Sequence, residues 1–207
     1  MIKGLETVRA NCANCKLELN STKCEVISAN SSFSNQVSAC LAGCRILEPS
    51  ASELLGAPLG QTAANASLIK KKASLHDVRP RLAAIDRHDA LAILRISLGH
   101  HKAIYTLRAG PSFDSSELSK YDDELGECAW DCLNVHFDDI RWKQASLHPF
   151  RGGLGIRSTT SLAHSSFLSA CESVSVIAGS LSGGAPDIDK PRALAQWRDL
   201  TRGASIP

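Results

Sequence analysis

The sequence predicts an α+β fold that is mostly α-helical, with a small β-containing part before a longer helical part. The 207 residues allow one or two domains with an apolar core, and 43% hydrophobic and 21% charged residues are typical of globular proteins. Short apolar runs beside turn residues occur before residue 60. Beyond it, apolar residues recur every three or four positions, the spacing of helices.

The first sixty residues are predicted to combine one helix with short strands. Residues 4–16 read as a helix, and polar turn residues then precede CEVIS, a short strand. VSACLAGCRIL fits either a helix or a buried strand, and periodicity does not decide between them. ELLGAPLG contains two glycines and a proline within five residues, which predicts a strand that breaks into a tight turn.

The next fifty residues are predicted to be helical. One apolar stripe consists of Leu68, Leu75, Val78, Leu82 and Ile85, and a second of Ala90, Leu91, Leu94 and Leu98, running on toward Ile104 and Leu107. Pro80 interrupts the first stripe and should kink or divide that helix, because proline lacks the amide hydrogen. Gly110 and Pro111 should end the second stripe.

Charge is distributed unevenly along the chain, although the net charge is only +2. Residues 61–110 hold nine lysines and arginines against three aspartates, a net charge of +6. Residues 111–140 hold one lysine against nine acids, a net charge of −8. The pattern suggests a surface that faces a polyanion beside one that avoids it. Two solvated helical faces that pair with each other would give the same pattern.

Two short motifs, Tyr121-Asp122-Asp123 and Phe137-Asp138-Asp139, are similar to the aromatic-x-Asp-Asp metal-binding turn of nucleic-acid polymerases, but both lack the spacer residue. Helical spacing of Leu118, Tyr121, Leu125, Cys128 and Cys132 accounts for the first motif. We therefore expect a buried tyrosine and two aspartates that diverge by about 100° as surface charges. The second motif is expected to begin a short helix, with its aspartates at the N-cap and first turn.

The remaining helix boundaries follow from local patterns. Asp114 and Glu117 are a plausible capping pair for the helix that carries Tyr121. RGGLGIRS predicts a glycine-rich turn before a helix over roughly residues 160–175. A flexible linker then leads to a last short helix, ALAQWRDL.

The cysteines are the only candidates for a metal site. Cys12-x2-Cys15 together with Cys40-x3-Cys44 could supply four thiolates to zinc. Against this, Cys15 falls at a predicted helix end, Cys40 and Cys44 lie one turn apart in an apolar run, and free cysteine is a common core residue. We assign no metal site, and whether these four cysteines bind zinc stays open.

The compartment is expected to be nuclear or cytoplasmic. The chain has no run of 18 or more apolar residues and begins without the apolar segment of a secretory signal. We therefore expect no membrane partner, no secretion, and eight cysteines that stay reduced.

Three stretches in order resemble the reverse transcriptase of non-LTR (LINE-type) retrotransposons over about residues 10–172. They are LELNSTKCEVIS, ELLGAPLG, and the block from HDALAILRISLGHHKAIYTLRAGPSF to QASLHPFRGGLGIRS. The resemblance implies a palm remnant with a primer-grip-like hairpin over 1–60, a basic helical thumb over 61–110, a helical connector over 111–175, and a linker with a short helix over 176–207. It also implies that the metal-binding aspartates lie upstream of Met1.

The resemblance assigns roles to individual residues. Lys23 matches a palm lysine that assists protonation of pyrophosphate, and Leu55, Gly56 and Ala57 match the primer grip. Cys15 or Lys16 replaces the glycine that usually precedes this palm segment. Independently of the resemblance, charge selects Lys70, Lys71, Lys72, Arg79 and Arg81 as phosphate contacts. Few aromatic residues accompany them, so base stacking is not indicated.

These observations predict a fragment of an RNA-directed DNA polymerase that holds an RNA/DNA template–primer. By itself the fragment is expected to be inert and to need no cofactor, with Mg²⁺ required only by the intact polymerase. Its expected protein partner is the missing N-terminal fingers and palm half. The alternative is a stand-alone helical module, derived from a retroelement, that binds nucleic acid or protein.

Overall fold

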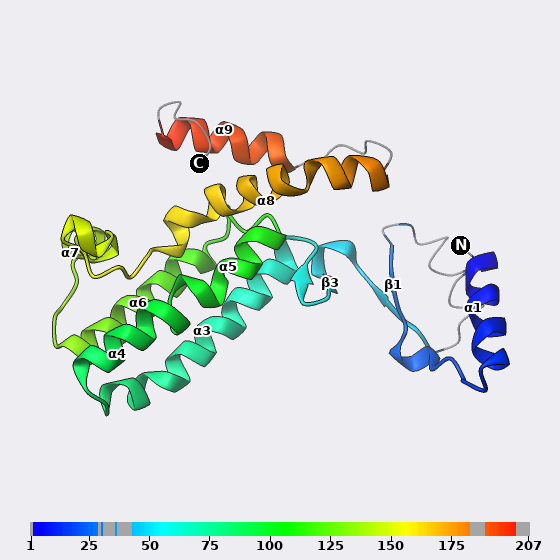
Figure 1. Ribbon diagram of the computed structural model, residues 1–207, viewed down its shortest axis with the longest axis horizontal. Helices are drawn as coiled ribbons and strands as arrows, with labels where there is room; N and C mark the ends of the chain where they lie inside the picture. The colour runs from blue at the N-terminus through cyan, green and yellow to red at the C-terminus, as the bar shows by residue number, and fades with distance from the viewer. Residues whose placement is uncertain (1, 29, 31–35, 37–42, 183–188, 202–207) are drawn as a thin grey trace. The chain divides into compact units, whose positions relative to one another are not determined.

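The protein is mostly helical, with a few short strands in two small sheets (Figure 1), and this confirms the predicted α+β, mostly α-helical class. The computed structural model describes residues 2–28, 30, 36, 43–182 and 189–201. The chain forms two compact units, one up to Ser52 and one from Glu53 onward. Each unit is described below by itself.

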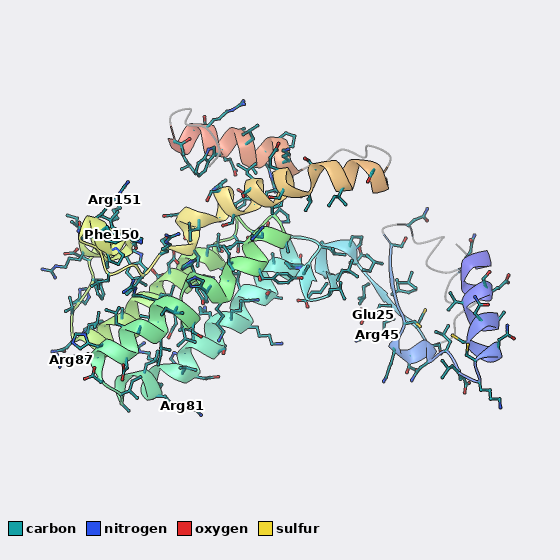
Figure 2. The ribbon with its side chains drawn as sticks, viewed as in Figure 1. Glu25, Arg45, Arg81, Arg87, Phe150 and Arg151 are labelled. Carbon is teal, nitrogen blue, oxygen red and sulfur yellow. The ribbon has the colours of Figure 1, made fainter. Side chains whose placement is uncertain are left out.

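The first unit combines short helices with a two-stranded sheet. Its elements are α1 (Ile2–Asn14), η1 (Ser21–Lys23), β1 (Glu25–Ile27), β2 (Arg45–Leu47) and η2 (Pro49–Ala51). The strands β1 and β2 are parallel, and Glu25 pairs with Arg45 both in register and as an ion pair (Figure 2). The helix and strand predicted before residue 30 are confirmed. Of the ambiguous run VSACLAGCRIL, the end is strand β2, and residues 37–42 lie outside the described residues.

A β-hairpin opens the second unit. The strands β3 (Glu53–Leu54) and β4 (Ala57–Pro58) are joined by Leu55 and Gly56, whose φ angles of 53° and 76° form the predicted tight turn. The hairpin packs closely on the helices, since a Cβ atom at Gly110 would lie 2.8 Å from the carbonyl oxygen of Pro58. This packing explains why the observed division falls after Ser52, whereas the predicted one falls after residue 60.

Helices make up the rest of the second unit. They are α3 (Gln61–Ala83), α4 (Arg87–Ile93), the π-helical turn η3 (Leu94–Leu98), α5 (His100–Ala109), α6 (Glu117–Leu133), α7 (Asp139–Ser146), η4 (Pro149–Arg151), α8 (Thr159–Ser182) and α9 (Asp189–Thr201). Helix α3 packs along α6, α5 packs against α8, and α9 lies along α8 (Figure 1).

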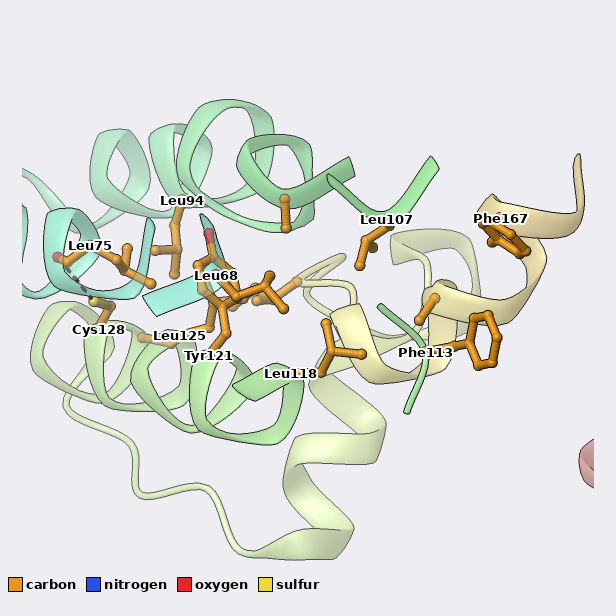
Figure 3. Packing of buried hydrophobic residues seen from close by; sticks show 14 of the residues in the cluster. Leu68, Leu75, Leu94, Leu107, Phe113, Leu118, Tyr121, Leu125, Cys128 and Phe167 are labelled. Carbon is orange, nitrogen blue, oxygen red and sulfur yellow. Dashed lines mark hydrogen bonds between the residues drawn. The ribbon is translucent and has the colours of Figure 1, made fainter. Parts of the chain in front are cut away.

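The core lies between α3, α5, α6 and α8, and it contains the predicted apolar stripes. Leu68, Leu75, Leu94, Leu107 and Tyr121 are fully buried in one cluster (Figure 3). The last residue of the first stripe, Ile85, is 42% exposed because α3 ends before it. Pro80 does not divide α3, which continues to Ala83, so that part of the prediction is wrong. The missing amide hydrogen costs only the bond to the carbonyl of residue 76, and the helix ends within one turn of the proline.

The two aspartates of Tyr121-Asp122-Asp123 have different environments. Asp123 is exposed as predicted, whereas Asp122 is 7% exposed, and its predicted surface location is wrong. The carboxylate of Asp122 accepts hydrogen bonds from the backbone amides of Thr159 and Thr160 at 2.7 and 3.1 Å. It also accepts from the hydroxyls of Ser158 and Thr159, both at 2.7 Å. Asp122 therefore fastens the start of α8 to α6.

The capping pair predicted for the start of α6, Asp114 with Glu117, is also wrong. The hydroxyl of Ser115, rather than the carboxylate of Asp114, accepts a hydrogen bond from the amide of Glu117 at 3.2 Å. Asp114 instead accepts from the side-chain amide of Gln196 at 2.8 Å, an interaction with α9 that local patterns do not reveal. The predicted cap at Asp138 is confirmed, because its carboxylate accepts from the amide of Arg141 at 2.8 Å.

His100, the first residue of α5, is a histidine that resists protonation. Its Nδ1 atom is buried without a hydrogen-bond partner, and the ring centroid of His101 lies 3.8 Å away. Burial, with smaller contributions from His101 and Arg157, lowers the pKa of His100 to about 4.

We expect this histidine to make the protein less stable in mild acid. The unfolded chain binds a proton at a histidine pKa of 6.5, and the folded chain does so only near 4. The contribution of His100 to the free energy of unfolding is therefore complete above pH 6.5 and is lost as the pH falls toward 4. Lowering the pH from 7 to 5 should remove about 1–2 kcal/mol of stability through this histidine, once solvent screening is allowed for. Urea titrations at pH 7 and pH 5 measure the stability that each protein loses on acidification. The His100→Asn variant should lose less than the wild type, and equal losses would contradict the low pKa of His100.

Candidate nucleic-acid interface

The five cations predicted to contact phosphates point in three directions from α3. Each residue turns the helix by about 100°, so neighbouring side chains in the run Lys70-Lys71-Lys72 diverge. Lys72 and Arg79 face α6, Lys71 faces α5, and Lys70 and Arg81 are exposed to solvent (Figure 2 labels Arg81). Only part of the predicted set can therefore act on one ligand.

The side facing α6 is an internal ion-pair cluster. The Arg79 guanidinium donates to both carboxylate oxygens of Asp131 and to Glu127 at 3.1 Å. The Lys72 ammonium lies 3.9 Å from Glu117. The hydrogen bond and charge of Asp131 raise the pKa of Arg79, and Arg79 lowers the pKa of Asp131. For these residues, the alternative interpretation of the charge pattern is confirmed, because basic and acidic helical faces pair with each other.

We expect Arg79 to contribute to stability and Arg81 to contribute almost nothing. Arg79→Ala removes a partly buried cation and leaves three carboxylates close together, so the free energy of unfolding should fall by about 1–2 kcal/mol. Arg81→Ala, two residues away and exposed, is the matched control and should change it by less than about 0.5 kcal/mol. Urea denaturation of the three proteins tests this. Equal midpoints would show that the ion-pair cluster has no structural role.

The side facing α5 holds cations whose hydrogen-bond partners are hydroxyl groups. Lys71 donates to the Ser67 hydroxyl at 2.6 Å, and Lys102 on α5 donates to the Ser74 hydroxyl at 2.6 Å. The pKa of Lys71 is lowered, chiefly by burial of its ammonium group. The positive charges of Lys70 and Lys102 also lower this pKa, and the negative charge of Glu53 raises it. Neither hydroxyl partner neutralises its ammonium group, although the Glu53 carboxylate partly offsets the charge of Lys71, and such oriented cations suit binding of an anion.

The hairpin lies next to these cations. The Tyr105 hydroxyl on α5 donates to the carbonyl oxygen of Leu55 at 3.1 Å, and Tyr105 follows Lys102 by about one helical turn. The Leu55 side chain is 93% exposed at the tip of the turn. We use the name hairpin face for this surface, which consists of Leu55, Gly56, Ala57, Lys71, Lys102 and Tyr105, together with the exposed Lys70, whose charge acts on Lys71. The Glu53 carboxylate, which also acts on Lys71, borders it. The hairpin face joins the predicted primer grip to two of the predicted phosphate contacts.

Sequence reasoning missed Lys102 and Tyr105. Both lie in the run HHKAIYTL, where their helical spacing places them on one side of α5. The sequence gives no local indication that this side meets Ser74 of α3 and the hairpin. Those contacts join residues 28 and 50 positions apart, so they depend on how α3 and α5 pack.

The other predicted site residues lie in the first unit. Lys23 is exposed at the last position of η1. In the part of the chain that the structure describes, no group of three or more histidine, cysteine, aspartate and glutamate side chains is placed to hold a metal ion. Cys40 lies outside that part, so the four-cysteine zinc hypothesis stays as it was.

Comparison with protein-family models, curated proteins and solved structures finds no match to this chain. Among the described residues, no helix is both long enough and apolar enough to cross a membrane.

Proposed function

We propose that the chain is a piece of a LINE-type RNA-directed DNA polymerase, and that its second unit holds template–primer nucleic acid at the hairpin face. One observation carries this proposal. The turn that motif resemblance assigns to the primer grip lies beside cations that charge analysis selected independently. Tyr105 ties the turn to α5, because its hydroxyl donates to Leu55. Lys102 of the same helix acts on Lys71, one of the selected cations.

The chemistry of the hairpin face suits a nucleic-acid backbone. Lys70, Lys71 and Lys102 offer positive charge to phosphates, and Leu55 offers apolar surface to a sugar or a terminal base. The serine partners of Lys71 and Lys102 hold both ammonium groups in place before a ligand binds. Such contacts recognise charge and shape, so we expect little dependence on base sequence.

The sheet of the first unit supports the proposed partner, a missing fingers and palm half. Parallel strands are normally buried within larger sheets. The described residues contribute only β1 and β2 to this sheet, and Ile27 and Ile46 are 37% and 42% exposed. Further strands added beside β1 or β2 would satisfy the strand edges, and elements packed on the two faces of the enlarged sheet would cover both side chains. In this proposal the assembled polymerase acts in the nucleus or cytoplasm.

The chain by itself is proposed to be catalytically inert. Two-metal phosphoryl transfer needs carboxylates that converge on a pair of ions. The buried aspartate of the Tyr121-Asp122-Asp123 motif already accepts hydrogen bonds at the start of α8, which is a structural role. Primer extension on an RNA template with Mg²⁺ or Mn²⁺ should yield no product. Template-dependent synthesis by the purified chain would contradict this part of the proposal.

A salt titration tests nucleic-acid binding directly. The chain is titrated with a blunt RNA/DNA hybrid at several salt concentrations. If three lysines contact phosphates, log K should fall linearly with log[salt], with a slope of about −2 to −3. A flat dependence would contradict phosphate contact.

The alternative, a retroelement-derived module that binds protein, is favoured by a different observation. Val174 and Ile177 on α8 and Leu200 on α9 are 51%, 61% and 69% exposed, and such apolar side chains suit a protein partner. Binding of this kind would depend weakly on salt, so the same titration distinguishes the two functions.

A further inference from the structure

A cleft with basic and aromatic side chains lies on the second unit, formed by elements other than the hairpin face. Its volume is about 880 Å³, and its walls are α6, the segment from α7 through η4, and the start of α8. Phe150 and Arg151 stand on η4 at this cleft (Figure 2). No local pattern in the sequence predicts a ligand for these residues, and RGGLGIRS reads as a structural turn.

Phe150 is the most unusual residue of the cleft, because it is 96% exposed on a segment that is firmly held. The Gln144 side chain donates to the carbonyl of Gly152 at 2.9 Å, and the amides of Leu154 and Gly155 bond back to α7 and Leu147 at 3.0 and 2.9 Å. A Cβ atom at Gly153 would overlap the carbonyl of Leu147. The fold thus keeps a large aromatic ring in solvent, where it adds nothing to the core.

One side of this ring already takes part in stacking. The rings of Phe150 and His148 are nearly parallel, with an interplanar angle of 18° and centroids 5.1 Å apart. The high exposure of Phe150 leaves space for another planar group. A nucleobase is the planar group that would extend this stack, since every base has a face that stacks on an aromatic side chain.

Three cations line the same cleft as the stacked rings. Lys143, Arg151 and Arg157 line the cleft and are exposed, and in the described part of the chain no ion pair is observed for any of them. The amides at the start of α8 are occupied by Asp122, so the helix terminus is not the anion site. Asp122 and Asp123 also line the cleft, and their carboxylates would repel an anion. The three cations outnumber these two carboxylates, which favours a polyanion.

We propose that this cleft binds an unpaired segment of nucleic acid, with one base stacked on Phe150 and the adjoining phosphates beside Arg151, Arg157 and Lys143. This inference rests on the proposed function, since it assumes a chain that handles nucleic acid. It adds a site that prefers a single strand, because a base inside a duplex has both faces stacked on its neighbours. An acidic peptide would satisfy the cations and leave the ring without a partner.

The test compares the full chain and its Phe150→Ala variant, which changes only an exposed side chain. The ligands are a short unpaired oligonucleotide, an abasic oligonucleotide of equal length and charge, and a blunt RNA/DNA hybrid. Loss of one stacked base should weaken single-strand binding about tenfold and leave binding of the hybrid and of the abasic strand unchanged. Phe150→Tyr keeps a stacking ring and should restore most of the affinity.

Two charge variants test the phosphate contacts. Arg151→Gln should make the slope of log K against log[salt] less negative by about 0.7 for the single strand. Asp123→Asn removes one repelling carboxylate and should strengthen binding. Both residues are exposed, so neither substitution is expected to affect folding.

The outcomes separate this inference from the proposed function. If the hybrid binds with the expected salt dependence and Phe150→Ala leaves single-strand affinity unchanged, the cleft site is wrong and the hairpin face stands. Equal affinity of the wild type for base-bearing and abasic strands would also overturn the cleft site. If neither nucleic acid binds, the proposed function fails and the inference fails with it. Binding of polyglutamate that equals single-strand binding and is unaffected by Phe150→Ala would assign the cleft to acidic peptides instead.

Discussion

Asp122→Ala is expected to lower the free energy of unfolding by about 3–5 kcal/mol. The carboxylate accepts four hydrogen bonds from the start of α8 and is 7% exposed. Alanine would leave two backbone amides and two hydroxyls in this largely buried region without their acceptor. It would also remove the negative charge that stabilises the positive end of the helix dipole.

The neighbouring residue supplies a matched control. Asp123 is exposed on the same helix, so Asp123→Ala should change the free energy of unfolding by less than about 0.5 kcal/mol. Asp122→Asn keeps one acceptor oxygen, so its loss of stability should lie between those of Asp122→Ala and Asp123→Ala. Urea denaturation measures all three variants. Equal midpoints for Asp122→Ala and Asp123→Ala would contradict the role assigned to Asp122.

Tyr121→Ala is expected to cost about 3–5 kcal/mol, because it removes a fully buried aromatic ring from the centre of the core. Its hydroxyl donates toward the carbonyl oxygens of Leu98 and Gly99, at 2.9 and 3.2 Å, where the π-helical turn η3 meets α5. Burial raises the pKa of this hydroxyl, which therefore stays protonated and acts as a donor. Tyr121→Phe keeps the ring and should cost only about 1–2 kcal/mol.

The second tyrosine provides the comparison for the hydroxyl group. Tyr105 is 51% exposed and donates to Leu55, so Tyr105→Phe should cost less than about 0.5 kcal/mol. Thermal or urea unfolding of the two phenylalanine variants separates a buried hydrogen bond from an exposed one. Tyr121→Phe with wild-type stability would show that the hydroxyl does not hold the end of η3.

Periodicity predicted the helices and the direction of Tyr121 because burial repeats every three or four residues along one helix. It could not predict the fate of Asp122, because the hydroxyls and amides that this carboxylate binds belong to residues 36 to 38 positions further on. The capping residue at Asp138 was predictable, since its partner lies three residues away. Local interactions could thus be read from the sequence, and contacts between helices could not.

The candidate site was predictable to a similar extent. Charge selected Lys70 and Lys71, which lie on the helix after the hairpin, but it gave Arg79 the same weight. Only the packing of α3 on α6 shows that Arg79 is engaged with acidic residues 45 to 52 positions away. The composition of the basic segment indicated no base stacking. Phe150 lies outside that segment, and its exposure follows from backbone contacts that a composition count does not contain.

The central claim, that the hairpin face binds a nucleic-acid backbone, is tested most directly by two double variants measured with the same RNA/DNA hybrid. One is Lys70→Gln with Lys102→Gln, on the hairpin face. The other is Lys72→Gln with Arg198→Gln, which removes equal charge from the α6 side of α3 and from α9. Both should unfold cooperatively, as circular dichroism can verify.

We expect the hairpin-face variant to bind the hybrid on the order of tenfold to a hundredfold more weakly at 0.1 M salt, with a salt slope less negative by about 2. The matched variant should bind as the wild type does. Equal affinities and equal slopes for the two variants would contradict the account.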